Sequence, residues 1–153
     1  MTREKRKTIL QRIGFYSAVV LLCIGAWFLV RYEYARMKDA MKMTSIAESQ
    51  SVLSIYAARH GIYPSSPEGQ LVIGESSSIC VSRRGLVDPS SDQCREHGYG
   101  LLTGEQAYRS MSVDHKTLCS DLQGCPWYEI EFLLQTNVIA PAGLHTVTPE
   151  GLH

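Results

Sequence analysis

Four cysteines in the C-terminal two-thirds of the chain carry the clearest chemistry: Cys80, Cys94, Cys119 and Cys125. If this part lies outside the cytoplasm, four cysteines in a small loop-rich domain favour two disulfides, with three possible connectivities. We favour Cys80–Cys94 and Cys119–Cys125, because neighbours along the sequence close short loops at low entropic cost. Zinc is disfavoured, since there is no Cys-x-x-Cys pair and Cys119 and Cys125 are widely spaced for a zinc knuckle. Cys23 lies apart in an apolar stretch and is expected to be a packing residue.

Other residue types give little support for catalysis. The histidines are scattered without the spacing of a metal site or a catalytic dyad: His60, His97, His115, His145 and His153. Glu129 and Glu131 share one face of a predicted strand at a separation of about 7 Å, but an amphipathic strand places such residues on its solvated side. We therefore expect no enzyme activity, no cofactor and no metal.

Charge excludes one class of partner and suggests an orientation. The 153-residue chain has 15 basic and 15 acidic residues, so its net charge of zero gives no electrostatic case for nucleic acid. Residues 1–12 contain five basic residues and one acidic residue, whereas residues 31–153 contain ten and fourteen. Arg83 and Arg84 form a basic spot too small for DNA, and a minor role in adhesion stays open.

Residues 13–30 form a stretch of 18 residues without a charge or a proline, ten of them Leu, Ile, Val or Phe. As a helix this stretch covers roughly 27 Å, close to the ~30 Å hydrocarbon core of a bilayer. The basic cluster before it predicts a cytoplasmic N-terminus and an outward-facing C-terminal part. A cleaved signal peptide is the alternative, with a cut near Ile24-Gly25-Ala26. It is disfavoured because Ile24 is too large for the first small position of a cleavage site and because the apolar run continues to Val30.

Residues 31–60 contain no Gly or Pro and should continue the helix until Gly61 and Pro64 stop it. The spacing predicts an apolar face that could pack on a domain and includes Met37, Met41, Leu53, Tyr56 and Ala57. The same spacing assigns Arg36, Lys38 and Lys42 to the solvated side, with Asp39 at its flank.

The remaining chain has the composition of short strands and loops. We predict short strands at 71–73 and 79–81, a brief helix at 101–111 capped by Thr103, and a strand at 128–135 followed by a terminal hairpin strand at 144–147. One face of strand 128–135 is apolar and should cover the helix: Tyr128, Ile130, Phe132 and Leu134. The fold class is therefore α+β, with the outer half of a helix over 13–60 packed on a small antiparallel sheet.

Several features resemble type IV pilins and type II secretion pseudopilins. A basic leader ends at Gly14, the aromatic Phe15 follows it, and an apolar run leads into a long helix. Residues 53–64 are similar to the pseudopilin pattern in which a helix ends before Asn-Gly-x-Tyr-Pro, with His60 in place of Asn. Residues 128–135 and 143–151 resemble the closing hairpin of some pilin-like proteins. One position departs from the family, because Val19 stands where the family usually has Glu.

The resemblance implies a pilin-like lollipop with a leader at 1–14, a transmembrane half-helix at 15–30, an outer half-helix at 31–61 and a disulfide-stapled ectodomain at 62–153. It implies a non-enzymatic subunit of a type IV pilus-like or pseudopilus filament, which an assembly machinery takes from the inner membrane. A prepilin peptidase would cut between Gly14 and Phe15, and the new amine would usually be methylated. Val19 favours a minor or initiating subunit. The alternative is a single-pass membrane-anchored binding domain that does not polymerise and that keeps residues 1–14.

Overall fold

The computed structural model describes residues 3–120 and 124–153, with side chains from Arg12 onward except that of Pro67. Its longest element is the helix α1, Arg3–His60, which begins earlier than the sequence pattern predicts. The helix ends as expected, because Gly61 adopts a left-handed φ of 76° and donates its N–H to the Ala57 carbonyl at 2.7 Å. Residues up to Met37 form one compact unit and residues from Lys38 onward form a second.

The second unit contains two antiparallel sheets rather than the single sheet that we predicted. The larger has the order β1-β5-β6-β7-β8, with bounds Gln70–Ile73, Gln106–Met111, Trp127–Leu134, Gly143–Thr148 and Gly151–Leu152. The smaller has the order β3-β2-β4, with bounds Gly85–Val87, Ser78–Ser82 and Gly98–Thr103. A 3-10 turn, Pro67–Gly69, precedes β1, and the short helix α2, Asp92–His97, connects β3 to β4. The α+β class is confirmed, and so are the predicted strands at 71–73, 79–81, 128–135 and 144–147.

The brief helix predicted over 101–111 is wrong. The segment forms the end of β4 and the whole of β5, with Gly104 at a φ of 81° between them. The β5 strand lies between β1 and β6, and its residues alternate in burial as a strand requires. Local helix propensity therefore yields here to pairing with distant strands. The Gln106 side chain, three residues after the predicted cap, donates to the Thr103 carbonyl at 2.8 Å.

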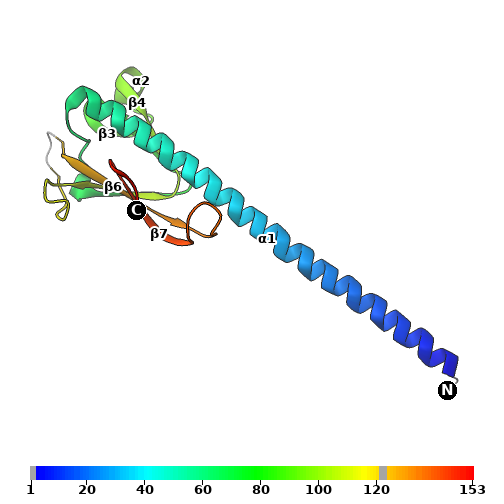
Figure 1. The fold of residues 1–153 in the computed structure, drawn as a ribbon. Helices are drawn as coiled ribbons and strands as arrows, with labels where there is room; N and C mark the ends of the chain where they lie inside the picture. Colours follow the sequence, from blue (N-terminus) through cyan, green and yellow to red (C-terminus); the bar gives the residue numbers. More distant parts are fainter. Residues whose placement is uncertain (1–2, 121–123) are drawn as a thin grey trace. The chain divides into compact units, whose positions relative to one another are not determined.

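The hydrophobic core lies between the inner face of β6 and the C-terminal part of α1. Tyr128, Ile130, Phe132 and Leu134 are all buried, as predicted, and they form one cluster with residues of α1: Ile46, Leu53 and Tyr56. In Figure 1 this part of α1, in cyan to green, runs along the strands. Burying such an apolar face contributes about 1.5–3 kcal/mol per large side chain.

The predicted inner face of the helix is correct only toward its C-terminal end. Met37 and Met41 are more than half exposed, whereas Asp39, expected at the flank of the solvated side, is 2% exposed. The buried side chains of α1 recur at steps of three, four and seven residues from Asp39 through Ile46 and Ser49 to Tyr56. The buried face of α1 is thus rotated about the helix axis relative to the predicted face. The reason is that its first buried residue is Asp39, a carboxylate whose hydrogen-bond partners lie far along the chain.

Candidate functional site: an exposed apolar segment and a basic groove

The apolar segment at 13–30 lies in the N-terminal unit and has no covering within the described chain. Every residue from Arg12 to Tyr34 is exposed, and this helix contains an 18-residue window with a mean hydropathy of 2.3. The helix is therefore long and apolar enough to span a membrane. At the end of the segment, Arg31 lies 5.2 Å from the ring centre of Trp27, and Tyr32 and Tyr34 are exposed nearby. Aromatic and basic side chains of this kind are typical of the membrane–water boundary.

The predicted processing residues also lie in the N-terminal unit, inside unbroken helix. Gly14 accepts a hydrogen bond from the Ser17 hydroxyl at 2.9 Å, and Phe15 packs edge-to-face on Tyr16 with ring centres 6.1 Å apart. A Cβ added at Gly14 would meet nothing within 4 Å, and the same holds for Gly25. The open space around both positions means that packing within the described chain does not require glycine at either one. Glycine also destabilises a helix by about 1 kcal/mol relative to alanine, so local stability does not favour it either. Val19 is 41% exposed.

Both disulfides have the connectivity that the short loops favour. Cys80 of β2 is bonded to Cys94 of α2, and Cys119 is bonded to Cys125, so this prediction is confirmed. Among the described residues, Cys23 is the free cysteine, and it is exposed within the apolar segment. The first disulfide fixes α2 against the smaller sheet.

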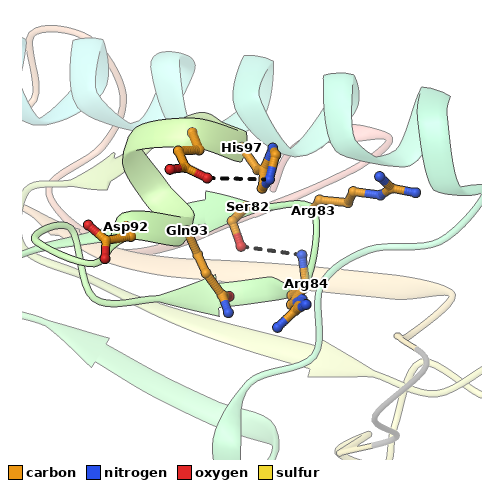
Figure 2. Close-up of a pocket in the computed structure, with 7 residues that line it drawn as sticks. Ser82, Arg83, Arg84, Asp92, Gln93 and His97 are labelled. Carbon is orange, nitrogen blue, oxygen red and sulfur yellow. Dashed lines mark hydrogen bonds and ion pairs between the residues drawn. The ribbon is translucent and has the colours of Figure 1, made fainter.

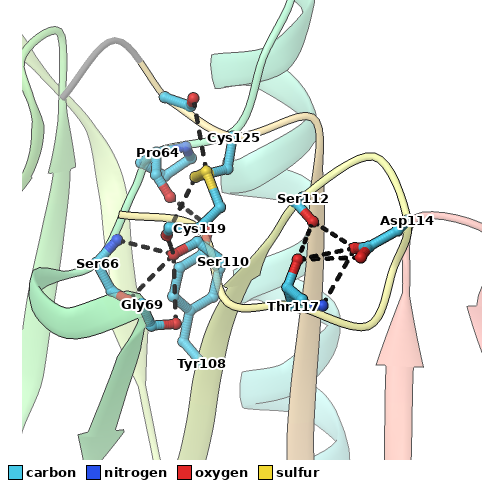
Figure 3. The surroundings of a disulfide bond; sticks show 11 residues. Pro64, Ser66, Gly69, Tyr108, Ser110, Ser112, Asp114, Thr117, Cys119 and Cys125 are labelled. Carbon is cyan, nitrogen blue, oxygen red and sulfur yellow. Dashed lines mark hydrogen bonds between the residues drawn. A yellow bond between two sulfur atoms is a disulfide. The ribbon is translucent and has the colours of Figure 1, made fainter. Parts of the chain in front are cut away.

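The second disulfide closes the loop before β6, and one of its members, Cys125, also pairs with the segment that follows α1. Tyr63 and Cys125 exchange two backbone hydrogen bonds of 2.7 and 2.8 Å. Figure 3 shows the neighbouring polar contacts, in which Tyr108 donates to the Pro64 carbonyl at 2.6 Å and Ser110 to the Cys119 carbonyl at 2.6 Å. Burial raises the pKa of Tyr108 well above its ordinary value, so the phenol stays a hydrogen-bond donor. These contacts stabilise the fold and form no reactive group.

Asp39 connects α1 to the end of β6, a role that the sequence pattern missed. Its carboxylate accepts hydrogen bonds from the backbone N–H of Gln135 and Thr136, the latter at 2.7 Å, and from the Thr136 hydroxyl at 2.7 Å. Burial raises the pKa of Asp39, but the donors from Gln135 and Thr136 outweigh it and hold the pKa below its ordinary value. Lys42, one turn along, donates to the Leu133 carbonyl at 2.9 Å and to Glu105 at 3.0 Å. The pair therefore anchors the helix to the sheet.

A groove with three arginines lies where α1, α2 and the β2–β3 turn meet. We call it the basic groove and define it by Arg59, His60, Arg83, Arg84, His97 and Tyr99. It consists of two adjoining cavities of about 510 and 700 Å³, which share Arg83, Glu96 and His97 in their walls. Figure 2 shows Gln93 and His97 of α2 on the side of the turn that carries Arg83 and Arg84, with Asp92 at the other end of α2.

The remaining candidates from the sequence are dispersed. Glu131 pairs with Arg109 at 2.5 Å on the outer face of the larger sheet, and Glu129 lies opposite Arg109 in the register. His115 stacks on Trp127, and His145 stacks on Phe132. His60 and His97 line a common cavity. Comparison of the chain with family models, with curated proteins and with solved structures finds no match.

Proposed function

We propose that this protein is a minor or initiating subunit of a type IV pilus-like or pseudopilus filament, held in the inner membrane with its N-terminus in the cytoplasm. The observation that carries the proposal is the exposed apolar segment 13–30, which continues in the same helix into the core of a disulfide-bonded α+β unit. A soluble chain rarely leaves so large an apolar surface uncovered. Lipid before assembly and neighbouring helices after assembly would supply the missing contacts.

Two features of the leader support processing by a prepilin peptidase. Basic residues precede the apolar segment, as a cytoplasmic leader requires, and Gly14 stands where packing gives no reason for glycine. Packing gives no reason for glycine at Gly25 either. The Gly14–Phe15 junction is therefore distinguished by its position between the basic leader and the apolar segment. Cleavage there would remove residues 1–14 and create a charged amine on Phe15.

Val19 supports the restriction to a minor or initiating place. In the family that the sequence resembles, a glutamate at this position neutralises the amine of a neighbouring subunit inside the apolar filament core. An unpaired ammonium in such surroundings costs several kcal/mol, and a filament made only of this chain would incur that cost at every subunit. One copy among glutamate-bearing subunits, or a copy at the tip, avoids the repeated cost.

The composition of sheared filaments tests this proposal. We expect this chain to be present at a small fraction of the bulk subunit, and Val19→Glu to raise that fraction because the charge pair is restored. Val19→Leu is the matched control and should leave the fraction unchanged. Filaments made chiefly of the unaltered chain would contradict the minor role, and absence from every filament fraction would favour a membrane-anchored binding domain.

A further inference from the structure

The basic groove holds arginines that the fold does not use. Other polar residues of this region contact one another: Arg95 forms an ion pair with Asp92 at 2.9 Å, and the His97 ring lies 3.9 Å from the Glu96 carboxylate. Arg83 and Arg84 form no ion pair with any carboxylate in the described part of the chain. Arg59 lies 5.1 Å from the ring centre of Tyr99 and likewise lacks a carboxylate partner among those residues. Three permanent cations of the groove therefore have no carboxylate partner within the described part of the chain.

The two neighbouring arginines occupy a tight hairpin turn. Ser82 pairs with Gly85, so Arg83 and Arg84 are the two residues of the turn. Neither has a positive φ, and the left-handed position, with a φ of 106°, is taken by Gly85, so the turn accepts most residue types at both arginine positions. Two hydrogen bonds of the buried Ser82 hydroxyl stabilise the turn: it accepts from the Arg84 N–H at 3.3 Å and donates to the Gly85 carbonyl at 3.1 Å. The backbone of the turn is thus fixed while both arginine side chains stay exposed.

The opposite wall of the groove is also held firmly. The Cys80–Cys94 bond attaches α2 to β2, and Arg83 donates its N–H to the His97 carbonyl at 3.2 Å. A Cβ at Gly98 would lie 2.4 Å from the Cys94 carbonyl oxygen, so glycine permits α2 to end directly against β4. On the α1 side, the His60 ring stacks on Tyr56 and lies 2.9 Å from the Tyr99 hydroxyl. A groove built on fixed backbone loses little entropy when a ligand binds.

We propose that the basic groove binds an acidic segment of a partner protein through its carboxylates. Guanidinium groups match carboxylates geometrically and form charge-assisted hydrogen bonds with them. Two adjoining cavities of about 510 and 700 Å³ accommodate several residues rather than one anion. This binding is additional to filament assembly and does not depend on it.

The lining favours a peptide over a nucleic acid. Asp92 and Glu96 stand among the cations and would repel an evenly charged phosphate backbone, whereas an acidic segment can place neutral residues beside them. The groove also offers little surface on which a base could stack, because the ring of Tyr99 already contacts Arg59, His60 and Tyr56.

Binding is tested with the full chain in nanodiscs of uncharged phosphatidylcholine. The probe is a peptide of alternating glutamate and glycine that carries fluorescein and a photoreactive benzophenone. We expect Arg84→Gln to weaken binding about fivefold and the R83Q/R84Q double variant about 25-fold, the effect of one or two partly exposed charge pairs. Lys116→Gln is the matched control, since Lys116 is exposed and lies outside both cavity walls.

Crosslinking separates the groove from the basic leader. Mass spectrometry should map the crosslinks to residues 82–99 and 55–60. Crosslinks confined to residues 1–12, or equal losses for Arg84→Gln and Lys116→Gln, would overturn the proposal. Tighter binding of an oligothymidylate than of the peptide would also overturn it. The same holds if inorganic phosphate displaces the labelled peptide at a concentration no higher than the concentration of unlabelled peptide that displaces it. Unchanged melting temperatures of the variants would show that a loss of binding is not a loss of folding.

Discussion

The two halves of α1 meet opposite environments. In residues 13–30 every side chain is exposed, and no described part of the chain covers this segment. Between Lys38 and His60 the same helix buries Ile46, Leu53 and Tyr56 against its own sheets. Helix formation and burial are therefore separate matters in this chain, because one half of α1 is buried against the sheets and the other half is helical without being buried.

The largest effect should come from the core of the second unit. Phe132→Asp places a carboxylate among residues that are at most a few per cent exposed, which should cost about 4 kcal/mol or more and unfold residues 38–153. Insertion of residues 13–30 into the membrane should be unaffected. Near-ultraviolet circular dichroism during heating measures the first effect and carbonate extraction of membranes the second. A melting curve like that of the unaltered chain would show that β6 does not pack on α1.

Removal of either disulfide should have the next largest effect on the free energy of unfolding. Replacing both members of the Cys80–Cys94 pair by serine should reduce the free energy of unfolding by about 3 kcal/mol, because the bond closes a loop with a sequence separation of 14. The Cys119–Cys125 pair has a separation of 6, so its loss should cost about 2 kcal/mol. Urea titration in detergent measures both. Peptide mapping without reductant should find Cys23 as the single free thiol of the mature chain, and a larger effect of the shorter loop would contradict the entropic order.

Asp39 should give a smaller and pH-dependent effect. Because the folded-state pKa is below the ordinary value, the carboxylate contributes its stability above about pH 4 and loses it as the pH falls through the folded-state pKa. Asp39→Asn should therefore cost about 2 kcal/mol at neutral pH, and the difference from the unaltered chain should shrink in acid. Glu48→Gln, on an exposed position of α1, is the control and should change stability by less than about 0.5 kcal/mol. An Asp39→Asn difference that is constant with pH would contradict the charged role.

The smallest effect should be in the apolar half of the helix. Leu22 is 73% exposed, so Leu22→Ala should change the free energy of unfolding of residues 38–153 by less than about 0.5 kcal/mol. By contrast, Leu53→Ala in the buried half should cost about 3 kcal/mol. Urea titrations of the two variants measure the contrast between the halves directly. Equal losses would mean that the apolar half is covered by the chain itself.

Local patterns predicted the parts of this molecule that depend on near neighbours. The alternation from Tyr128 to Leu134 identified β6, Gly61 marked the end of α1, and short loops indicated both disulfides. What was missed depends on partners far along the chain. Asp39 reads as a surface carboxylate because its donors lie 96 and 97 residues away, and β5 reads as helical because its two strand neighbours are distant.

The basic groove also depends on residues that are far apart in the sequence, so local patterns could not predict it. Arg83-Arg84 was visible in the sequence as a basic spot, yet nothing local predicted that Arg59 and His97 would line the same groove. Two residues of one hairpin turn gain a binding surface only when α1 and α2 are folded beside them. The signal available in the sequence was the pair of adjacent arginines followed directly by Gly85.

The most direct test of the proposed function is the N-terminal mass of the full-length protein purified from its native membrane. Cleavage between Gly14 and Phe15 predicts a mature chain that begins at Phe15, has lost residues 1–14 and carries a methyl group on its amine. The Gly14→Leu variant should keep the leader, which ties the mass change to the junction rather than to general proteolysis. A chain that retains residues 1–14 in the native membrane would contradict the pilin-like account and leave a membrane-anchored domain in its place.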